Sequence, residues 1–178
     1  MARMVVGTPI GLWIVEWSEQ GIRRAFWWTE TAFTGLPWTI EDVDTPDRRD
    51  PIARWLIDWL KMYRIGRWDL AIVQSVWQYR APHTIRSTFH RRVYDALLRV
   101  PPGRTITYRE LATIVSVPRA ARAVGRAMAT NPFPVLIPCH RVIRSDGTIG
   151  AYAAGTPIKR WLLNWEQSVT ETTCRSTP

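Results

Sequence analysis

Residues 105–128 read TITYRELATIVSVPRAARAVGRAM, and this stretch decides the fold of the second half of the chain. The pattern predicts a short helix over residues 108–116, a turn at Val117-Pro118 and a second helix over residues 119–128. Two short helices joined by a tight turn are typical of a helix-turn-helix. Alanine, glycine and arginine crowd the second helix, which would let it approach a groove of DNA closely. Helix packing would explain the same small residues equally well.

Residues 137–143, which read IPCHRVI, contain a candidate nucleophile. Cys139 is one of only two cysteines, follows a proline and precedes one of only three histidines. A neighbouring base or positive charge can lower the pKa of a thiol below its free value of about 8.5. The pair of Cys139 and His140 therefore predicts a reactive thiol. For an arbitrary Cys-His pair, the more common situation is a small buried side chain beside a surface histidine.

The composition limits the size and location of the protein. A chain of 178 residues that is 46% apolar can bury a full core and form one domain or two small ones. Its two cysteines, one of them Cys174 near the end of the chain, cannot form a disulfide framework, which favours a reducing compartment. No long apolar segment or signal-like start is evident. We therefore expect a soluble, cytoplasmic protein with no membrane partner.

Charge is distributed unevenly along the chain. Residues 1–82 carry ten basic and ten acidic side chains, whereas residues 83–178 carry fourteen basic and five acidic ones. The whole formal charge of +9 therefore belongs to the second half. An arginine-rich segment with few acids is the electrostatic pattern expected for nucleic-acid binding. A uniformly basic composition would instead raise the charge of both halves alike.

The first half has the pattern of a small β-rich domain. Apolar and aromatic runs over residues 11–17 and 21–28 are separated by three polar residues and predict a hairpin. An acidic loop is expected over residues 41–50, followed by an amphipathic helix over residues 51–62. Nine of the eleven tryptophans precede residue 80, and we interpret them as core residues.

The two halves together predict an α/β (α+β) protein. Residues 1–82 would form the β-rich amino-terminal domain with one helix. Residues 83–168 would form a mostly helical carboxy-terminal domain, whose first helix ends before Pro101 and which contains the helix-turn-helix. The Thr/Ser-rich residues 169–178 are expected to be a flexible tail.

Five ordered segments resemble the O6-alkylguanine-DNA alkyltransferase family, also called methylated-DNA-protein-cysteine methyltransferases. They are PPGRTITYRELA (101–112), AARAVGRAM (120–128), NPFPVLIPCHRVI (131–143), DGTIGAY (146–152) and KRWLLNWE (159–166). The likeness is nearly continuous from Phe89 to Glu166. The first half resembles the variable domain of the family more loosely.

The resemblance implies a definite chemistry for the second half. Cys139 would attack the alkyl carbon on the guanine oxygen, leaving a thioether on the protein and an intact guanine in DNA. His140 would be the base that reaches the thiol proton through a bound water, and Glu166 would hold His140 in orientation. A thioether does not hydrolyse, so each molecule would act once. No cofactor is implied.

The resemblance also implies how the thiol reaches its substrate, double-stranded DNA that contains O6-alkylguanine. The damaged nucleotide must leave the base stack. Arg122 would fill the vacated space, and Tyr108 would crowd the phosphate and contact the flipped guanine. Asn131 would brace the loop that bears Cys139, so Tyr108 and Asn131 are counted with the catalytic residues. The second helix would enter the minor groove with its small residues. These are Ala120, Ala121, Ala123 and Gly125.

A base pocket is the last element that the resemblance implies. Its expected residues are Pro134, Val142, Tyr152, Ala153 and Lys159, with Lys159 near the rim. At residues 153 and 154, alanines stand where relatives have Ser-Gly or other residues. A side-chain hydroxyl that could bind the guanine oxygen is therefore missing, and a backbone N–H would have to serve.

Some relatives bind zinc in the first domain, but residues 1–138 of this chain contain no cysteine. Only His83 and His90 are available there, so we expect no metal. We expect a monomer. Two other classes of protein remain open. One is a module that flips damaged bases without repairing them, although such relatives carry another residue at the position of Cys139. The other is a helix-turn-helix regulator with a structural or redox-sensing cysteine.

Overall fold

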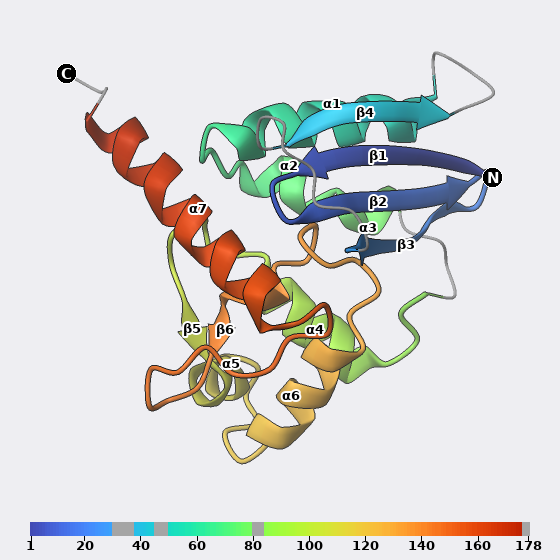
Figure 1. The fold of residues 1–178 in the computed structure, drawn as a ribbon. Helices are drawn as coiled ribbons and strands as arrows, with labels where there is room; N and C mark the ends of the chain where they lie inside the picture. The colour runs from blue at the N-terminus through green and yellow to red at the C-terminus, as the bar shows by residue number, and fades with distance from the viewer. Residues whose placement is uncertain (30–37, 45–49, 80–83, 176–178) are drawn as a thin grey trace. The chain divides into compact units, whose positions relative to one another are not determined.

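The computed structural model describes residues 1–29, 38–44, 50–79 and 84–175. The chain divides into two compact units, Met1–Thr84 and Ile85–Pro178. The sequence placed the boundary between residues 82 and 83, and residues 80–83 lie outside the described ranges. The α/β fold class is confirmed, with a β-sheet in the first unit and mostly helices in the second (Figure 1).

A four-stranded antiparallel sheet with strand order β3-β2-β1-β4 forms the base of the first unit (Figure 1). The strands are β1 (Ala2–Thr8), β2 (Gly11–Ser18), β3 (Gly21–Trp28) and β4 (Thr39–Asp44). The predicted hairpin is confirmed as β2 and β3. Alternate residues of β2, namely Trp13, Val15 and Trp17, are buried on one face, as the period of a strand requires.

Two strands of this sheet were not predicted. β1 pairs with both β2 and β4, although Gly7 lies within it and a proline follows it closely. The predicted loop over residues 41–50 is wrong at its start, because β4 pairs with β1 in the register Met4↔Val43 and Val6↔Ile40. The acidic composition masked this strand, but charged residues are common on the edge strand of a sheet. Residues 45–49 lie outside the described ranges.

Helix α1 (Pro51–Arg64) follows the sheet as predicted and extends two residues beyond the expected end. The Asp50 side chain caps it by accepting hydrogen bonds from the backbone N–H groups of Ile52 and Ala53 at 2.8 and 3.1 Å. The ring of Trp59 lies 5.7 Å from that of Trp13, so α1 packs on the buried face of β2. Five tryptophans of this unit are thus part of its buried core, namely Trp13, Trp17, Trp38, Trp55 and Trp59. Two short helices, α2 (Leu70–Gln74) and α3 (Val76–Tyr79), complete it.

The second unit contains the two helices that the sequence predicted around a tight turn. Its elements are α4 (Thr88–Leu97), β5 (Ile106–Thr107), α5 (Tyr108–Ile114), α6 (Ala121–Ala129), the 3-10 turn η1 (Cys139–Arg141), β6 (Val142–Ile143) and α7 (Thr156–Arg175). Thr107 and Glu110 form a reciprocal capping box that fixes the start of α5. Buried Val124, Ala127 and Met128 mark the inner face of α6.

A two-residue parallel ribbon joins the start of α5 to the end of the cysteine turn. Ile106 pairs with Val142 and Thr107 pairs with Ile143. Parallel strands need a long crossover, and here the crossover contains α5, α6 and η1. Helices α5 and α6 and the cysteine are therefore built on one segment of chain, whose two ends pair with each other.

The predicted flexible tail is wrong for the described part of residues 169–178, because α7 continues to Arg175. The threonines that suggested disorder bind carbonyls of the helix itself. The Thr170 hydroxyl donates to the backbone oxygen of Glu166 at 2.9 Å. A Cβ on Gly103 would lie only 2.5 Å from the same hydroxyl, so the helix is packed closely there. None of the described helices is both long and apolar enough to span a membrane.

Candidate active site

Cys139 begins the short turn η1 and is buried. Asn131, which follows α6, holds this turn from the side. Its Nδ2 donates to the backbone oxygen of Ile137 at 2.8 Å and to Sγ of Cys139 at 3.0 Å. Its Oδ1 accepts from the backbone N–H of Phe133 at 3.0 Å, which fixes the orientation of the amide. Asn131 thus lies where the resemblance placed it, against the loop that bears the thiol.

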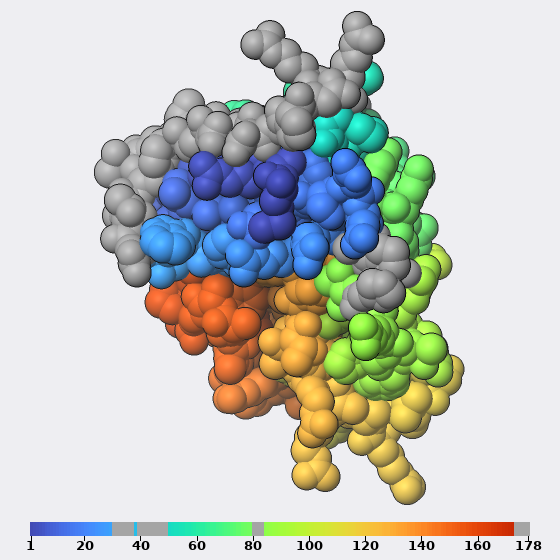
Figure 2. Space-filling model, turned by 90° about the vertical axis from the view of Figure 1, so that its right-hand side faces the viewer, coloured from blue at the N-terminus to red at the C-terminus, as the bar shows by residue number. Residues whose placement is uncertain are grey.

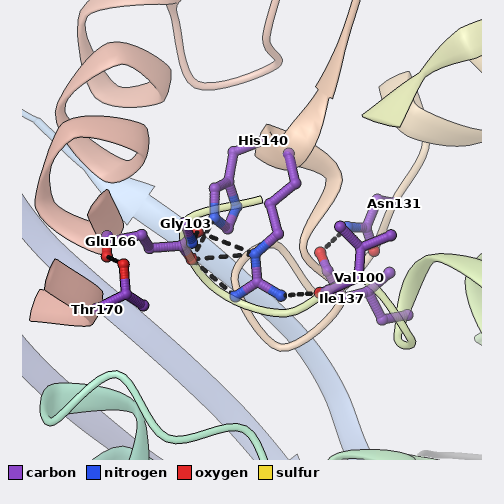
Figure 3. A network of polar contacts seen from close by, with 8 residues as sticks. Val100, Gly103, Asn131, Ile137, His140, Glu166 and Thr170 are labelled. Atoms are coloured by element: carbon purple, nitrogen blue, oxygen red, sulfur yellow. Dashed lines mark hydrogen bonds and ion pairs between the residues drawn. The ribbon is translucent and has the colours of Figure 1, made fainter. Parts of the chain in front are cut away.

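A buried polar network lies directly after the cysteine (Figure 3). Nε2 of His140 lies 2.8 Å from Oε1 of Glu166, and neither side chain is exposed. The guanidinium of Arg141, also unexposed, donates to both carboxylate oxygens at 2.7 to 3.2 Å. A fourth donor, the backbone N–H of Gly103, lies 3.3 Å from Oε2. The carboxylate of Glu166 is therefore the centre of the network.

Burial and charge set the protonation states of this network. Burial lowers the pKa of His140 below its ordinary value, although Glu166 acts in the opposite direction. Burial alone would raise the pKa of Glu166, but the charge of Arg141 and the contact with His140 hold it well below its usual range. Because an ionised carboxylate can only accept, Nε2 of His140 carries the proton of the hydrogen bond. The imidazole is thus neutral, with its Nδ1 basic.

The thiol itself is held in its neutral form in the free protein. Burial raises the pKa of Cys139, and this outweighs the lowering effects of Asn131, Lys159 and Tyr152. The expectation that neighbours lower this pKa below the ordinary value is therefore wrong. The sequence shows the adjacent base but not the degree of burial, which determines the sign of the shift.

The thiol opens into a pocket of about 550 Å³. Seven residues assigned from the sequence line it together. They are Cys139, Tyr108, Ala121, Arg122, Gly125, Tyr152 and Ala153. Met128, Ala129, Arg144 and Ala151 complete the wall. The ring of Tyr108 approaches α6 closely, since a Cβ on Gly125 would lie 3.9 Å from it.

Three residues expected in the base pocket do not line it. Val142 and Lys159 are fully buried, and Pro134 lies in a bridge with Ile137. Lys159 is therefore not at the rim. Its Nζ donates to the backbone oxygen of Val142 at 2.6 Å, and burial lowers its pKa to about 8. A helical lysine is usually exposed, and the sequence gives no sign that α7 turns this one inward.

The outer face of α6 carries the residues expected to contact DNA. Arg122 and Ala123 are exposed, Ala121 and Gly125 are half-buried, and Ala120 is the N-cap residue. In Figure 2, long side chains of the yellow-orange segment that includes α6 extend into solvent. Arg122 and Arg126 are exposed on this helix, whose other outward positions are small.

Two arginines at the site were not predicted. Arg144 is exposed and lines the pocket, and Arg141 is buried in the Glu166 network. One feature of the sequence bears on Arg141. A buried arginine needs a carboxylate partner, and the second half of the chain offers only five acidic residues as partners, Glu166 among them.

No group of three or more potential metal ligands occurs in the described ranges of the chain. His83, one of the two histidines considered for zinc, lies outside those ranges. His90 lies in α4 with its ring 6.1 Å from that of Tyr94.

The fold and the site define a class of protein in which a buried cysteine, followed by a histidine-carboxylate pair, lines a pocket together with a short helix. Comparisons with known proteins identify the family. The family model described as 6-O-methylguanine DNA methyltransferase, DNA binding domain, matches residues 88–168. The methylated-DNA–protein-cysteine methyltransferase of Salmonella typhimurium is 34% identical over 167 residues, which cover 90% of this chain and 92% of that protein. The chain belongs to the methylated-DNA–protein-cysteine methyltransferase family.

Other relatives match a shorter part of the chain. The mouse protein of the same name is 52% identical over 83 residues, 46% of this chain and 39% of its own length. The Methanosarcina barkeri protein is 49% identical over 80 residues, 45% of this chain and 51% of its own length. The match thus spans about half or less of these two relatives.

Solved structures match nearly the whole chain. The Mycobacterium tuberculosis OGT in complex with DNA has a TM-score of 0.68 and 29% identity, covering 94% of this chain and 93% of that chain. The O6-methylguanine-DNA methyltransferase of Pyrococcus kodakaraensis has a TM-score of 0.64 and 26% identity, covering 93% and 99%.

Proposed function

We propose that the protein removes the alkyl group from O6-alkylguanine in double-stranded DNA and keeps it on Cys139. The observation that carries this proposal is the position of Sγ, at the wall of a pocket that α6 also lines, with the buried pair of His140 and Glu166 directly behind it. Two relatives support the substrate: one is named for methylated DNA and one was crystallised with DNA.

Sulfur attacks the alkyl carbon in line with the bond to the guanine oxygen. A carbon–sulfur bond forms as the carbon–oxygen bond breaks, and the electron pair leaves with the guanine. The thiol proton passes to Nδ1 of His140. The guanine anion then takes up one proton from water while the imidazolium releases one to water, so neutral guanine and neutral His140 are restored. Nδ1 makes no hydrogen bond to any described residue, while Nε2 is held by Glu166. The resting pair of neutral thiol and neutral imidazole is suited to this transfer, because charge develops only as the reaction proceeds.

The target base must reach a buried thiol, so the nucleotide is extruded from the duplex into the pocket. The small outer face of α6 lets the helix lie close to the minor groove, and Arg122 occupies the space that the base leaves. Tyr108 and Tyr152 line the pocket together with the thiol, and their rings would hold the flat base there. The protein acts as a monomer. Each molecule acts once, because the thioether that it forms is stable. A free thiol nucleophile also suits the cytoplasm, which is reducing.

Mass spectrometry tests this proposal directly. After mixing with a duplex that contains one O6-methylguanine, the protein should gain the mass of one methylene group, and peptide mapping should place it on Cys139. An undamaged duplex is the control. A protein that binds the damaged duplex yet gains no mass would be a binding module, and a gain at another residue would refute the assignment of Cys139.

Arg122→Ala should slow the repair of duplex DNA by about 10- to 100-fold, since the flipped state loses the side chain that fills the gap, which is worth a few kcal/mol. It should hardly change the reaction with a free O6-alkylguanine base, which needs no flipping. Single-turnover rates on the two substrates measure the difference. Arg126→Ala, on the same helix but not in the pocket wall, is the matched control. Equal losses of rate on both substrates would give Arg122 another role.

A further inference from the structure

The proposed chemistry accounts for His140 and Glu166 but not for Arg141, which binds both carboxylate oxygens of Glu166. Its Nε and Nη2 donate to Glu166, and Nη1 donates to the backbone oxygen of Val100 at 2.5 Å. All three side chains of the network are completely buried. Figure 3 shows the dashed contacts converging on the Glu166 carboxylate, with Gly103 beside it.

Burying three ionisable side chains together lowers stability unless their mutual contacts offset the cost of desolvation. Removing ions from water costs several kcal/mol each, and an apolar replacement is often as stable. Orienting an imidazole does not need an arginine either, because a buried carboxylate or carbonyl can do so. Arg141 therefore has an effect that Glu166 alone would not provide.

That effect is electrostatic. Oε1 of Glu166 is shared, because Nε2 of His140 lies 2.8 Å from it and Nη2 of Arg141 lies 2.7 Å from it. A lone buried carboxylate at this distance would attract a proton, either to itself or to the imidazole. A guanidinium on the same oxygen compensates its charge. The carboxylate can then orient His140 without making it a cation.

We infer that Arg141 is a positioning residue that keeps Glu166 ionised and His140 neutral, so that Nδ1 remains able to accept the proton of Cys139. The inference rests on the proposed function, in which His140 is the base. Arg141 itself is not among the residues that line the pocket.

Three charged groups among the described residues act on the charge of His140. Burial disfavours the imidazolium most, Glu166 on α7 favours it, and Arg141 on η1 and Lys159 on α7 disfavour it. Cys139 is the adjacent group and is neutral at rest. Removing Arg141 leaves Glu166 opposed by burial and by Lys159, whose ammonium is bound to the backbone oxygen of Val142. The balance should therefore move toward protonation.

The test combines NMR with rates. The chain has three histidines, so nitrogen-labelled imidazoles can be followed separately across pH. In the unaltered protein His140 should stay neutral, with its proton on Nε2, from pH 6 to 8. In Arg141→Gln the pair should take up a proton at higher pH. The ratio of transfer rates at pH 8.5 and 6.5, with saturating methylated duplex, should then rise about tenfold, which corresponds to one unit of pKa.

Two variants separate charge from structure. Arg141→Lys keeps the charge with fewer hydrogen bonds, so it should transfer more slowly but retain the unaltered rate ratio. Arg92→Gln also loses an arginine that binds a backbone oxygen, that of Val115, and should leave both the ratio and the His140 titration unchanged. A folded Arg141→Gln protein with an unaltered ratio would overturn the inference.

If Arg141→Gln does not fold, the NMR measurement on His140 of the unaltered protein still tests the inference. An imidazolium at His140 at pH 7, or a neutral ring with its proton on Nδ1, would overturn the inference. That NMR result does not depend on alkyl transfer. It is therefore distinct from a failure of the proposed function, which would show as the absence of an adduct on Cys139.

Discussion

Cys139→Ala is expected to abolish alkyl transfer while leaving DNA affinity within a few-fold of that of the unaltered protein. The thiol is the only nucleophile assigned to the pocket, and alanine has no atom that could form the thioether. The loop should persist, because Asn131 still binds the backbone oxygen of Ile137 without the sulfur contact. Adduct mass measures the transfer, and fluorescence anisotropy at one fixed salt concentration measures the affinity.

The second cysteine provides the control for this prediction. Cys174→Ser should react like the unaltered protein, because residue 174 lies near the end of α7 and outside the pocket wall. Any adduct formed by the Cys139 variant would contradict the proposed chemistry. A loss of DNA affinity of a hundredfold or more would instead show that the thiol turn supports the DNA-binding surface.

Glu166→Gln is expected to lower the free energy of unfolding by about 3–5 kcal/mol, because the guanidinium of Arg141 is left buried without a counter-charge. Transfer should fall by about 100-fold, since the neutral amide no longer stabilises the imidazolium that forms as the thiol proton is transferred. Urea unfolding followed by circular dichroism measures the first effect, and single-turnover rates at saturating DNA measure the second.

The pH dependence of this stability follows from the depressed pKa of Glu166. A carboxyl whose folded pKa is lowered stabilises the protein fully above its unfolded pKa, about 4.3, and loses that effect as pH falls toward the folded value. The difference between the two proteins should thus be constant from pH 6 to 8 and shrink in acid. Glu171→Gln is the matched control, being exposed on the same helix, and should change stability by less than about 0.5 kcal/mol. A similar loss in both variants would mean that the network adds nothing to stability.

Short-range sequence patterns predicted the elements of the fold that short-range interactions determine. The hairpin of β2 and β3, helix α1 with its proline at the first turn, and the helices α5 and α6 all follow from short-range periodicity and caps. Strand β1 was missed because Gly7 and a nearby proline interrupt its pattern. Its stability comes from neighbours on both sides, which the sequence does not show.

The site could be predicted in its members but not in its electrostatics. Cys139 and His140 are adjacent in sequence, whereas Glu166 lies on another element and was assigned only through the resemblance. Arg141 directly follows them in the sequence, but no pattern distinguished it from the other arginines among the 22 in the chain. Burial of Lys159 and the raised pKa of the thiol depend on how α7 packs, which is a property of the tertiary structure.

The parallel ribbon of β5 and β6 affects how DNA binding and recognition of a guanine base in the pocket are related. Tyr108, the first residue of α5, directly follows one strand and Arg141 directly precedes the other, so the segment that carries α5 and α6 begins and ends at the same ribbon as the turn that holds the thiol. We expect this shared ribbon to couple DNA binding at α6, as proposed above, to the position of the thiol. Coupling of this kind is reciprocal in free energy. The factor by which bound DNA raises the affinity of the pocket for a guanine base must equal the factor by which an occupied pocket tightens the grip on DNA.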